Sequence, residues 1–254
     1  MARLTLKNVT VQYPIYNSRS FSLRNQIMRV STGGRIESEA GQVSVVTALK
    51  DVSFDLRDGD AVALMGHNGA GKSTMLRTLA GVYTPISGQI VREGRVSTML
   101  ELGAGIDGEL SGYENITRMG VLLGMSLREI ETHVPDIEQF CQLGDFLRLP
   151  VRTYSSGMST RLMFAVATTV QPDILLVDEI FGMGDAEFQV NAKRRMESLI
   201  EKVGIFVFAT HNDELIERYC NRFFRLEHGN VREMTRDEAL AAHYAATGRA
   251  APPQ

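Results

Sequence analysis

One stretch of the sequence has the residue types and spacing of a phosphate-binding loop. Residues 66–73 read Gly-His-Asn-Gly-Ala-Gly-Lys-Ser, between an apolar run, Ala61–Met65, and a helical pattern, Ser73–Ala80. Glycines there let backbone N–H groups wrap phosphate oxygens, and the start of the helix adds favourable partial charge. The lysine would supply a cation and the serine hydroxyl would ligate Mg²⁺. The loop predicts a nucleotide site made by Gly66, His67, Asn68, Gly69, Ala70, Gly71, Lys72, Ser73 and Thr74, with His67 as a tolerated loop residue rather than a catalytic one.

A second candidate for chemistry is a pair of carboxylates, Asp178 and Glu179, at the end of the apolar run Ile174–Val177. An unpaired carboxylate at the end of a buried strand is costly unless it meets a cation. A Mg²⁺ ion on a bound nucleotide is the natural partner for Asp178. The alternative is that the pair caps a following helix.

These residues need a scaffold of strands that alternate with helices. Strand patterns are found at Leu4–Val11, Ala48–Leu56, Ala61–Met65, Ile174–Val177 and Ile205–Ala209. Helical spacing is found at Ser73–Ala80, through most of the stretch from about Met99 to Met163, and at Glu187–Lys202. Such alternation predicts an α/β fold with a largely parallel sheet, interrupted by a mainly helical lobe.

Net charge, cysteine content and the lengths of apolar runs exclude several classes of protein. The net charge of −3 gives no reason to expect nucleic-acid binding. The two cysteines, Cys141 and Cys220, form no CxxC pattern, so we expect no structural disulfide and a reducing compartment. No apolar run approaches the ~20 residues that span a bilayer, and the first residues lack the apolar core of a secretory signal. A membrane role would therefore depend on a partner.

Four further motifs follow the loop in order. Residues 154–158 read Tyr-Ser-Ser-Gly-Met, 174–179 read Ile-Leu-Leu-Val-Asp-Glu, 184–185 read Gly-Asp, and 210–211 read Thr-His. With the phosphate loop, they resemble the signature, Walker B strand, D-loop and switch histidine of ABC ATPases. The resemblance covers nearly the whole chain. It implies a P-loop ABC ATPase fold of the α/β class, with a mixed or parallel sheet core and an inserted helical subdomain at about residues 99–165.

The resemblance implies a role for each matching residue. Glu179 would polarise the attacking water, and His211 would contact the γ-phosphate of ATP. Ser155 and Gly157 would reach the nucleotide on an opposite subunit, which implies a homodimer because the chain has one set of motifs. Tyr13 would stack on adenine, the alternative being a strand-end tyrosine packed at the surface.

Two residues are expected to couple the nucleotide to a membrane partner. ABC ATPases usually carry a glutamine between the phosphate loop and the helical lobe, but residues 96–103 contain none. Glu101 is the expected occupant, either near Mg²⁺ or facing solvent. Asp185 falls where the family has its D-loop aspartate. The signature also departs from the usual letters at three of its five positions but keeps Ser155 and Gly157.

These departures resemble one subfamily. The run Leu100–Ile116, the Tyr-Ser-Ser-Gly-Met signature and Gly184–Phe188 are similar to bacterial exporters of O-antigen, capsule and teichoic acid. This implies ATP and Mg²⁺ as cofactors, a membrane permease as partner, a lipid-linked polysaccharide as cargo and a place on the cytoplasmic face of the bacterial inner membrane. We expect one ABC ATPase domain over residues 1–240 and a flexible tail at 241–254. About forty residues after His211 are too few for a C-terminal carbohydrate-binding domain.

Other interpretations remain open. The nearest is an ATPase subunit of another ABC subfamily. An ABC ATPase acting on nucleic acid or ribosomes would be expected to have two cassettes or a long coiled coil. A regulatory module that binds ATP without hydrolysing it would not need the full set of Lys72, Asp178, Glu179 and His211. The segment Ser20–Val30 is either a short amphipathic helix near lipid or a solvated loop.

Overall fold

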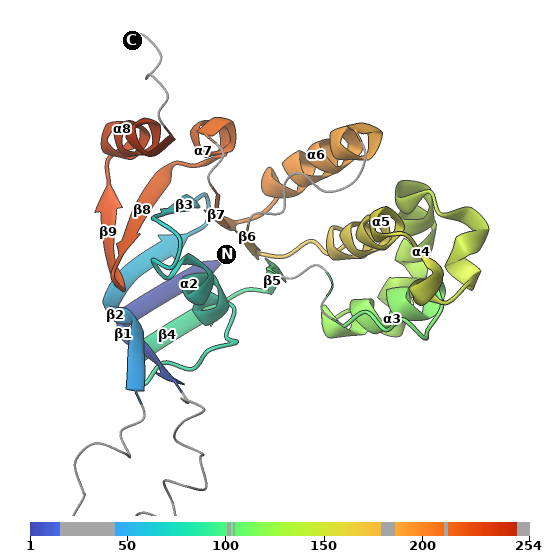
Figure 1. Cartoon of the computed structure of the whole chain (residues 1–254), viewed down its shortest axis with the longest axis horizontal. Helices are drawn as coiled ribbons and strands as arrows, with labels where there is room; N and C mark the ends of the chain where they lie inside the picture. Colours follow the sequence, from blue (N-terminus) through green and yellow to red (C-terminus); the bar gives the residue numbers. More distant parts are fainter. Residues whose placement is uncertain (16–43, 101–102, 104, 179–185, 211–212, 248–254) are drawn as a thin grey trace, which may run out of the picture.

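The computed structural model describes residues 1–15, 44–100, 103, 105–178, 186–210 and 213–247. They form an α/β core and a helical lobe, which lies to the right in Figure 1. The core contains two sheets. One is antiparallel, with the order β2-β1-β4 (Ser44–Arg57, Arg3–Ile15 and Ser87–Glu93).

The second sheet carries the functional loops at its strand ends. Its order is β5-β6-β7-β3-β8-β9, and every pairing is parallel except the final hairpin. The strands span Val96–Met99, Ile174–Asp178, Ile205–Ala209, Ala61–Met65, Arg222–Glu227 and Asn230–Met234. Since the carboxyl ends of parallel strands meet at one edge of a sheet, residues that follow β3, β6 and β7 are brought to the same edge.

The central strands are apolar throughout because both of their faces are covered. Ile174 and Leu176 of β6 belong to the core shared with the antiparallel sheet. Leu175 and Val177, with side chains on the opposite face, pack in the cluster that includes α6 (Ala186–Ile200). On the same side of the sheet, α7 (Asp213–Tyr219) and α8 (Arg236–Thr247) cover β3, β8 and β9.

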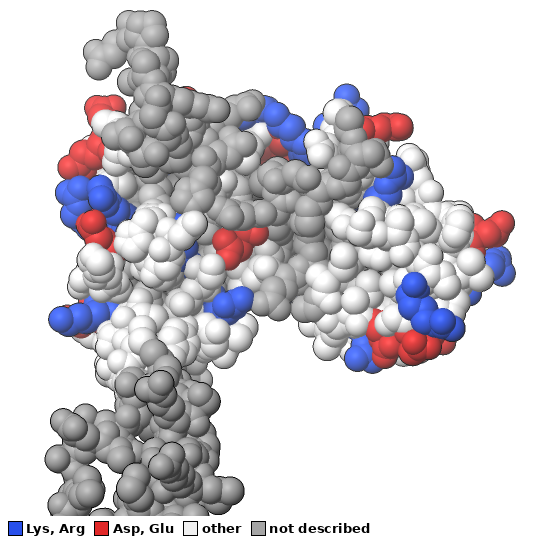
Figure 2. Space-filling model, in the orientation of Figure 1, with Lys and Arg blue, Asp and Glu red and all other residues white. Residues whose placement is uncertain are grey.

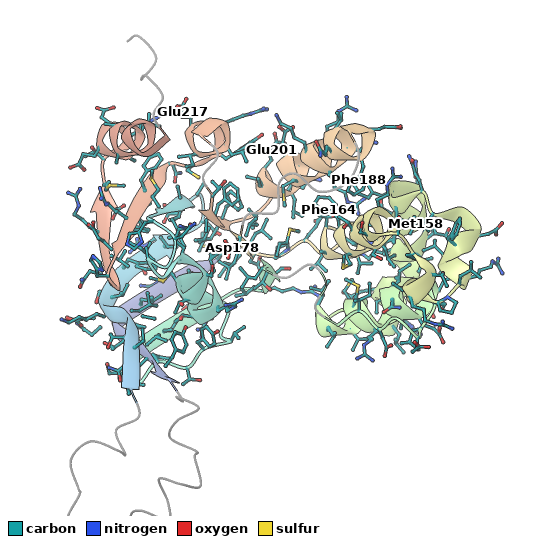
Figure 3. All side chains as sticks on the ribbon, in the orientation of Figure 1. Met158, Phe164, Asp178, Phe188, Glu201 and Glu217 are labelled. Atoms are coloured by element: carbon teal, nitrogen blue, oxygen red, sulfur yellow. The ribbon has the colours of Figure 1, made fainter. Side chains whose placement is uncertain are left out.

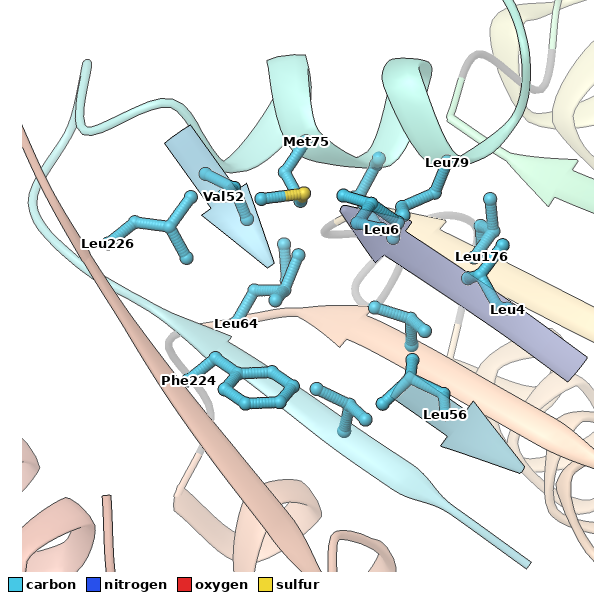
Figure 4. Close-up of a cluster of buried hydrophobic side chains, with 14 of the residues drawn as sticks. Leu4, Leu6, Val52, Leu56, Leu64, Met75, Leu79, Leu176, Phe224 and Leu226 are labelled. Carbon is cyan, nitrogen blue, oxygen red and sulfur yellow. The ribbon is translucent and has the colours of Figure 1, made fainter. Parts of the chain in front are cut away.

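The helix after the phosphate loop, α2 (Lys72–Leu79), fills the space where the two sheets meet. Figure 4 shows Met75 and Leu79 facing side chains from strands of both sheets, among them Leu6 and Leu64. All four are at most 1% exposed. Each buried side chain of this size contributes roughly 1.5–3 kcal/mol, so the loop that precedes α2 is held by a rigid element.

The helical lobe has a hydrophobic core of its own. It comprises α3 (Gly112–Leu122), α4 (Leu127–Cys141), two short 3₁₀ helices (Gly144–Arg148 and Val151–Thr153) and α5 (Ser156–Ala167). Ile116, Ile137 and Leu162 lie at its centre with no exposed surface. Capping boxes at Ser111–Glu114 and Ser126–Glu129 fix where α3 and α4 begin.

The predicted α/β class and the interruption of the sheet by helices are both found. The antiparallel sheet, the β8–β9 hairpin, α7 and α8 were not predicted. In the described part of the chain no helix is long and apolar enough to cross a bilayer. Acidic and basic side chains are interspersed over both lobes in the view of Figure 2, in keeping with the net charge of −3.

Candidate functional site

The phosphate loop connects β3 to α2 with a backbone that requires glycine at two points. Gly66 has φ 151° and Gly71 has φ 109°. A Cβ atom on Gly66 would lie 2.5 Å from the Leu226 carbonyl oxygen, and one on Gly71 would lie 3.0 Å from that of Ala48. The loop is therefore shaped by positive φ angles and also by close packing on β8 and β2.

Lys72 lies across the mouth of this loop. Its ammonium group donates to the Gly66 carbonyl at 2.6 Å and to the His67 carbonyl at 3.4 Å, and the residue is only 9% exposed. A buried ammonium needs such acceptors, because an unpaired charge in that place is costly. The first helical residue of α2 is therefore a cation directed at the concave side of the loop.

Ser73 and Asp178 meet at the end of the loop. The Ser73 hydroxyl donates to Asp178 Oδ2 at 2.7 Å. Figure 3 shows Asp178 in the middle of the core, where it ends β6. A hydroxyl and a carboxylate are hard oxygen ligands of the kind that Mg²⁺ prefers. The pair predicted as metal ligands is thus brought together, with a donor set that fits the ion.

An open pocket of about 790 Å³ surrounds the loop. Residues 67–74 form its floor, with Asp178 at one side and Tyr13, Val46, Thr47 and Ala48 of the antiparallel sheet at another. The pocket therefore contains most of the residues predicted to bind ATP and Mg²⁺. Gly66, the remaining loop residue, accepts the hydrogen bond from Lys72.

Tyr13 is half-buried at this pocket. Its ring packs edge-on against Tyr83, with centroids 5.2 Å apart and an interplanar angle of 70°. The hydroxyl oxygen is buried and makes no hydrogen bond of normal geometry to a described residue, although the Thr74 and Tyr83 hydroxyls lie near enough to influence it. Burial raises the pKa of the Tyr13 phenol. The Tyr13 ring therefore lines the pocket and also packs against Tyr83.

The turn between β8 and β9 also lines the pocket, and sequence reasoning missed it. His228, with φ 49°, and Gly229 are wall residues, and the His228 ring centroid lies 5.8 Å from that of His67. The Gly229 carbonyl accepts from the Lys50 backbone N–H at 2.8 Å. The Glu-His-Gly-Asn sequence is a recognisable turn signal. The sequence of this turn does not indicate that it lies beside the phosphate loop, some 160 residues earlier in the chain.

The signature residues lie at the start of α5, away from this pocket. Ser155 caps the helix, with its hydroxyl accepting from the Met158 N–H at 3.2 Å. The helix therefore begins at Ser156, inside the signature. Figure 3 shows Met158 on the lobe, well apart from Asp178. Ser155 is exposed, and a Cβ on Gly157 would meet only the Ser155 hydroxyl, at 3.9 Å.

Tyr154, which differs from the usual residue at this position of the signature, is held in the lobe by a hydrogen bond and by packing. Its hydroxyl donates to the Phe146 carbonyl at 2.7 Å, its ring packs on the lobe core, and burial raises its pKa. Tyr154 therefore positions the residues that follow it.

Several predicted residues lie outside the described part of the chain: Glu101, Glu179, Asp185 and His211, together with the segment Ser20–Val30. The strands that lead to Glu179 and His211 are nevertheless described. β6 and β7 end side by side, with Asp178 paired to Ala209.

Comparison with known proteins gives consistent results. The sequence model of the family described as ABC transporter matches residues 49–182. An O-antigen export system ATP-binding protein of Yersinia enterocolitica is 61% identical over 237 residues, covering 93% of this chain and 99% of that protein. One from Klebsiella pneumoniae is 36% identical, covering 95% and 96%. A teichoic acids export ATP-binding protein of Listeria innocua is 33% identical, covering 95% of this chain and 69% of its own length.

Solved structures agree on the fold. A dimeric ATP-binding cassette in a post-hydrolysis state, bound to ADP and phosphate, superposes with a TM-score of 0.65 at 21% identity, covering 91% of this chain and 98% of the other. An ATP-binding subunit of an ABC transporter superposes with a TM-score of 0.67 at 23% identity, covering 97% and 99%.

Proposed function

The chain belongs to the ABC transporter family as one of its ATP-hydrolysing subunits, and we propose that it powers export of a lipid-linked polysaccharide, such as O-antigen, through a separate membrane permease. The observation that carries the nucleotide part is the contact of Ser73 with Asp178 beside the buried ammonium of Lys72. The cargo part is supported by the 61% identical relative, whose name refers to O-antigen export.

ATP binds with its phosphates on residues 66–74, where Lys72 exchanges loop carbonyls for phosphate oxygens. Ser73 and Asp178 would hold Mg²⁺, an ion that would supply positive charge beside the phosphates. Tyr13 stacks on adenine from the wall of the pocket.

Glu179 follows Asp178 directly and orients the attacking water. It accepts the water proton as the water oxygen bonds to the γ-phosphorus and the bond from that phosphorus to the bridging oxygen breaks, which releases ADP. His211 contacts the same phosphate from the chain that follows β7. Support comes from strand order, because β6 and β7 are neighbours and both lead to the edge of the sheet where β3 leads to the loop. Preorganised donors there stabilise charge in the transition state.

The second half of each site comes from another copy of the chain. Ser155 is exposed and Gly157 partly exposed at the start of α5, and neither lines the pocket of its own chain. The N–H groups at the start of a helix can receive an anion such as a γ-phosphate. A head-to-tail homodimer would complete two sites with two ATP molecules.

The remaining assignments concern coupling. Glu101 and Asp185 link the state of the nucleotide to the permease, with Glu101 in place of the usual glutamine. Two permease subunits would pair with two ATPase subunits on the cytoplasmic face of the inner membrane. We assign residues 1–240 to one ABC ATPase domain, with the helical subdomain at about 99–165 inserted into it. The flexible tail predicted from residue 241 is wrong for residues 241–247, which belong to helix α8.

Copurification with the permease tests the proposal. ATPase activity should depend on both proteins, and the complex should retain a lipid-linked glycan that mass spectrometry can identify. Glu179→Gln should keep ATP binding and lose nearly all turnover. Normal turnover in this variant would refute the assignment of the base, whereas a different bound cargo would refute polysaccharide export alone.

A further inference from the structure

The helical lobe and the core meet at α6 through an aromatic cluster. Phe140 of α4, Phe164 of α5 and Phe188 of α6 lie with ring centroids 5.5–5.8 Å apart. Figure 3 shows Phe164 and Phe188 between the two parts of the molecule. Beside this cluster a groove of about 760 Å³ opens between α4, the end of α5 and α6. Phe164 and Phe188 belong to one buried cluster that joins α5 to α6 and the sheet, and the groove lies at its edge.

Arg195 of α6 makes the polar contact across this junction. Its guanidinium donates to both carboxylate oxygens of Asp136 on α4, at 3.2 and 2.5 Å. It also donates to the Thr169 hydroxyl at 3.3 Å and lies 4.5 Å from the Phe140 ring centroid. The Arg195 side chain is 18% exposed. A bidentate and partly desolvated pair has a defined geometry that a surface lysine could not provide.

The other side of α6 is tied to the next helix of the core. Glu197 accepts from the Tyr219 hydroxyl at 2.6 Å and pairs with Arg218 at 3.2 Å, both on α7. The chain positions directly before α6 include Glu179 and Asp185, and His211 comes shortly before α7. One helix thus contacts the lobe and also the helix that follows the predicted switch histidine.

We propose that Arg195 is a positioning residue, whose pair with Asp136 makes α6 turn with the lobe and so sets the approach of the catalytic residues that precede α6 and α7. The proposal rests on the proposed ATPase function. A lobe that lost this contact would still fold around its own core. It would bind ATP normally, because Arg195 lies outside the nucleotide pocket, but it would reach the hydrolysing arrangement less often.

A charge swap tests the pair in the full-length protein assembled with its permease. Asp136→Arg and Arg195→Asp should each lower kcat for ATP about fivefold or more, while the KM for ATP stays within about twofold, since binding is retained. The double variant should recover kcat to within about twofold of the wild type. Arg195→Lys keeps the positive charge but cannot make two parallel hydrogen bonds to the carboxylate. Because this change is conservative, the variant should fold, and it should give an intermediate kcat.

The matched control is Glu233→Ala. Glu233 accepts two hydrogen bonds from Arg222, at 2.7 and 2.9 Å, within the β8–β9 hairpin. The exposure of that pair, 24% and 48%, is close to the 18% and 54% of Arg195 and Asp136. Glu233→Ala should lower the melting temperature and leave kcat unchanged.

Unchanged kcat in both single variants, or in Arg195→Lys together with Arg195→Ala, would overturn the proposal. So would a folded double variant without recovery of kcat. An inactive wild-type complex would instead refute the proposed ATPase function.

Discussion

The Ser73 hydroxyl donates a 2.7 Å hydrogen bond to Asp178 Oδ2, which joins the first turn of α2 to the last residue of β6. The two residues are 105 positions apart in the sequence. Without a metal ion, each satisfies the other. In the proposed function these two side chains would hold Mg²⁺, and their contact would keep the two ligands together in the absence of nucleotide.

Asp178→Asn removes the negative charge at this contact and keeps the size of the side chain. The amide oxygen can still accept from Ser73, so the protein should fold with an unchanged melting temperature. Loss of the carboxylate should reduce kcat by about 100-fold or more, because the metal loses an anionic ligand. ATP binding measured without Mg²⁺ should not weaken, since a negative charge near the phosphates has been removed.

Ser73→Ala should likewise reduce activity, and Ser97→Ala is its control. Ser97 lies on β5, and its hydroxyl is buried without a hydrogen-bond partner in the described structure. Removing it should cost no stability and no activity. Equal activity in Ser73→Ala and Ser97→Ala, measured with saturating Mg²⁺ and ATP, would contradict the assigned metal site.

Gly71→Ala and Gly69→Ala should differ in stability although both positions have positive φ, 109° and 82°. An alanine at either position pays about 1–2 kcal/mol for its backbone conformation. Only at Gly71 would the Cβ also meet a backbone atom, the Ala48 carbonyl oxygen at 3.0 Å, whereas nothing lies within 4 Å at Gly69. Urea unfolding of the nucleotide-free protein should therefore show the larger loss for Gly71→Ala. Equal losses would mean that packing against β2 does not shape the loop.

Tyr13→Phe and Tyr13→Ala test adenine stacking. Phenylalanine keeps the ring and removes a buried hydroxyl that lacks a normal hydrogen bond, so ATP affinity and stability should both be retained. Alanine removes the stacking surface, which is worth about 1–3 kcal/mol per base, and ATP should bind at least about fivefold more weakly in calorimetry. If Tyr13→Ala binds ATP as the wild type does, Tyr13 only packs against Tyr83.

Asn115→Ala should destabilise the helical lobe. This fully buried side chain donates to the carbonyls of Asp107, Leu110 and Ser111 and accepts from the Asp107 N–H at 2.8 Å. Its loss leaves several buried backbone groups unpaired, at a cost of about 2–4 kcal/mol by the usual penalty per group. Gln139→Ala, at an exposed position of α4, should change the free energy of unfolding by less than about 0.5 kcal/mol.

The sequence predicted those parts of the site that are formed by residues close together in the chain. The order of strand, loop and helix around Lys72 follows from local spacing, and Asp178 follows from a carboxylate at the end of an apolar strand. Ser155 was predicted only as a phosphate ligand, whereas in the structure it also caps α5.

Contacts between distant parts of the chain were beyond prediction. Nothing near His228 or Gly229 in the sequence indicates that their turn forms a wall of the nucleotide pocket. Asp136 and Arg195 read as ordinary exposed charges on two amphipathic helices, and only the packing of α4 on α6 brings them together.

The position of β3 has a consequence for how the protein is made. Its neighbours in the sheet are β7 and β8, and Gly66 packs against the Leu226 backbone. During synthesis, the phosphate loop is therefore complete long before β7 and β8, the strands that pack beside it, have been made. We therefore expect the loop to reach its binding shape only after β8 has been synthesised, and a chain that ends before β8 to bind ATP poorly.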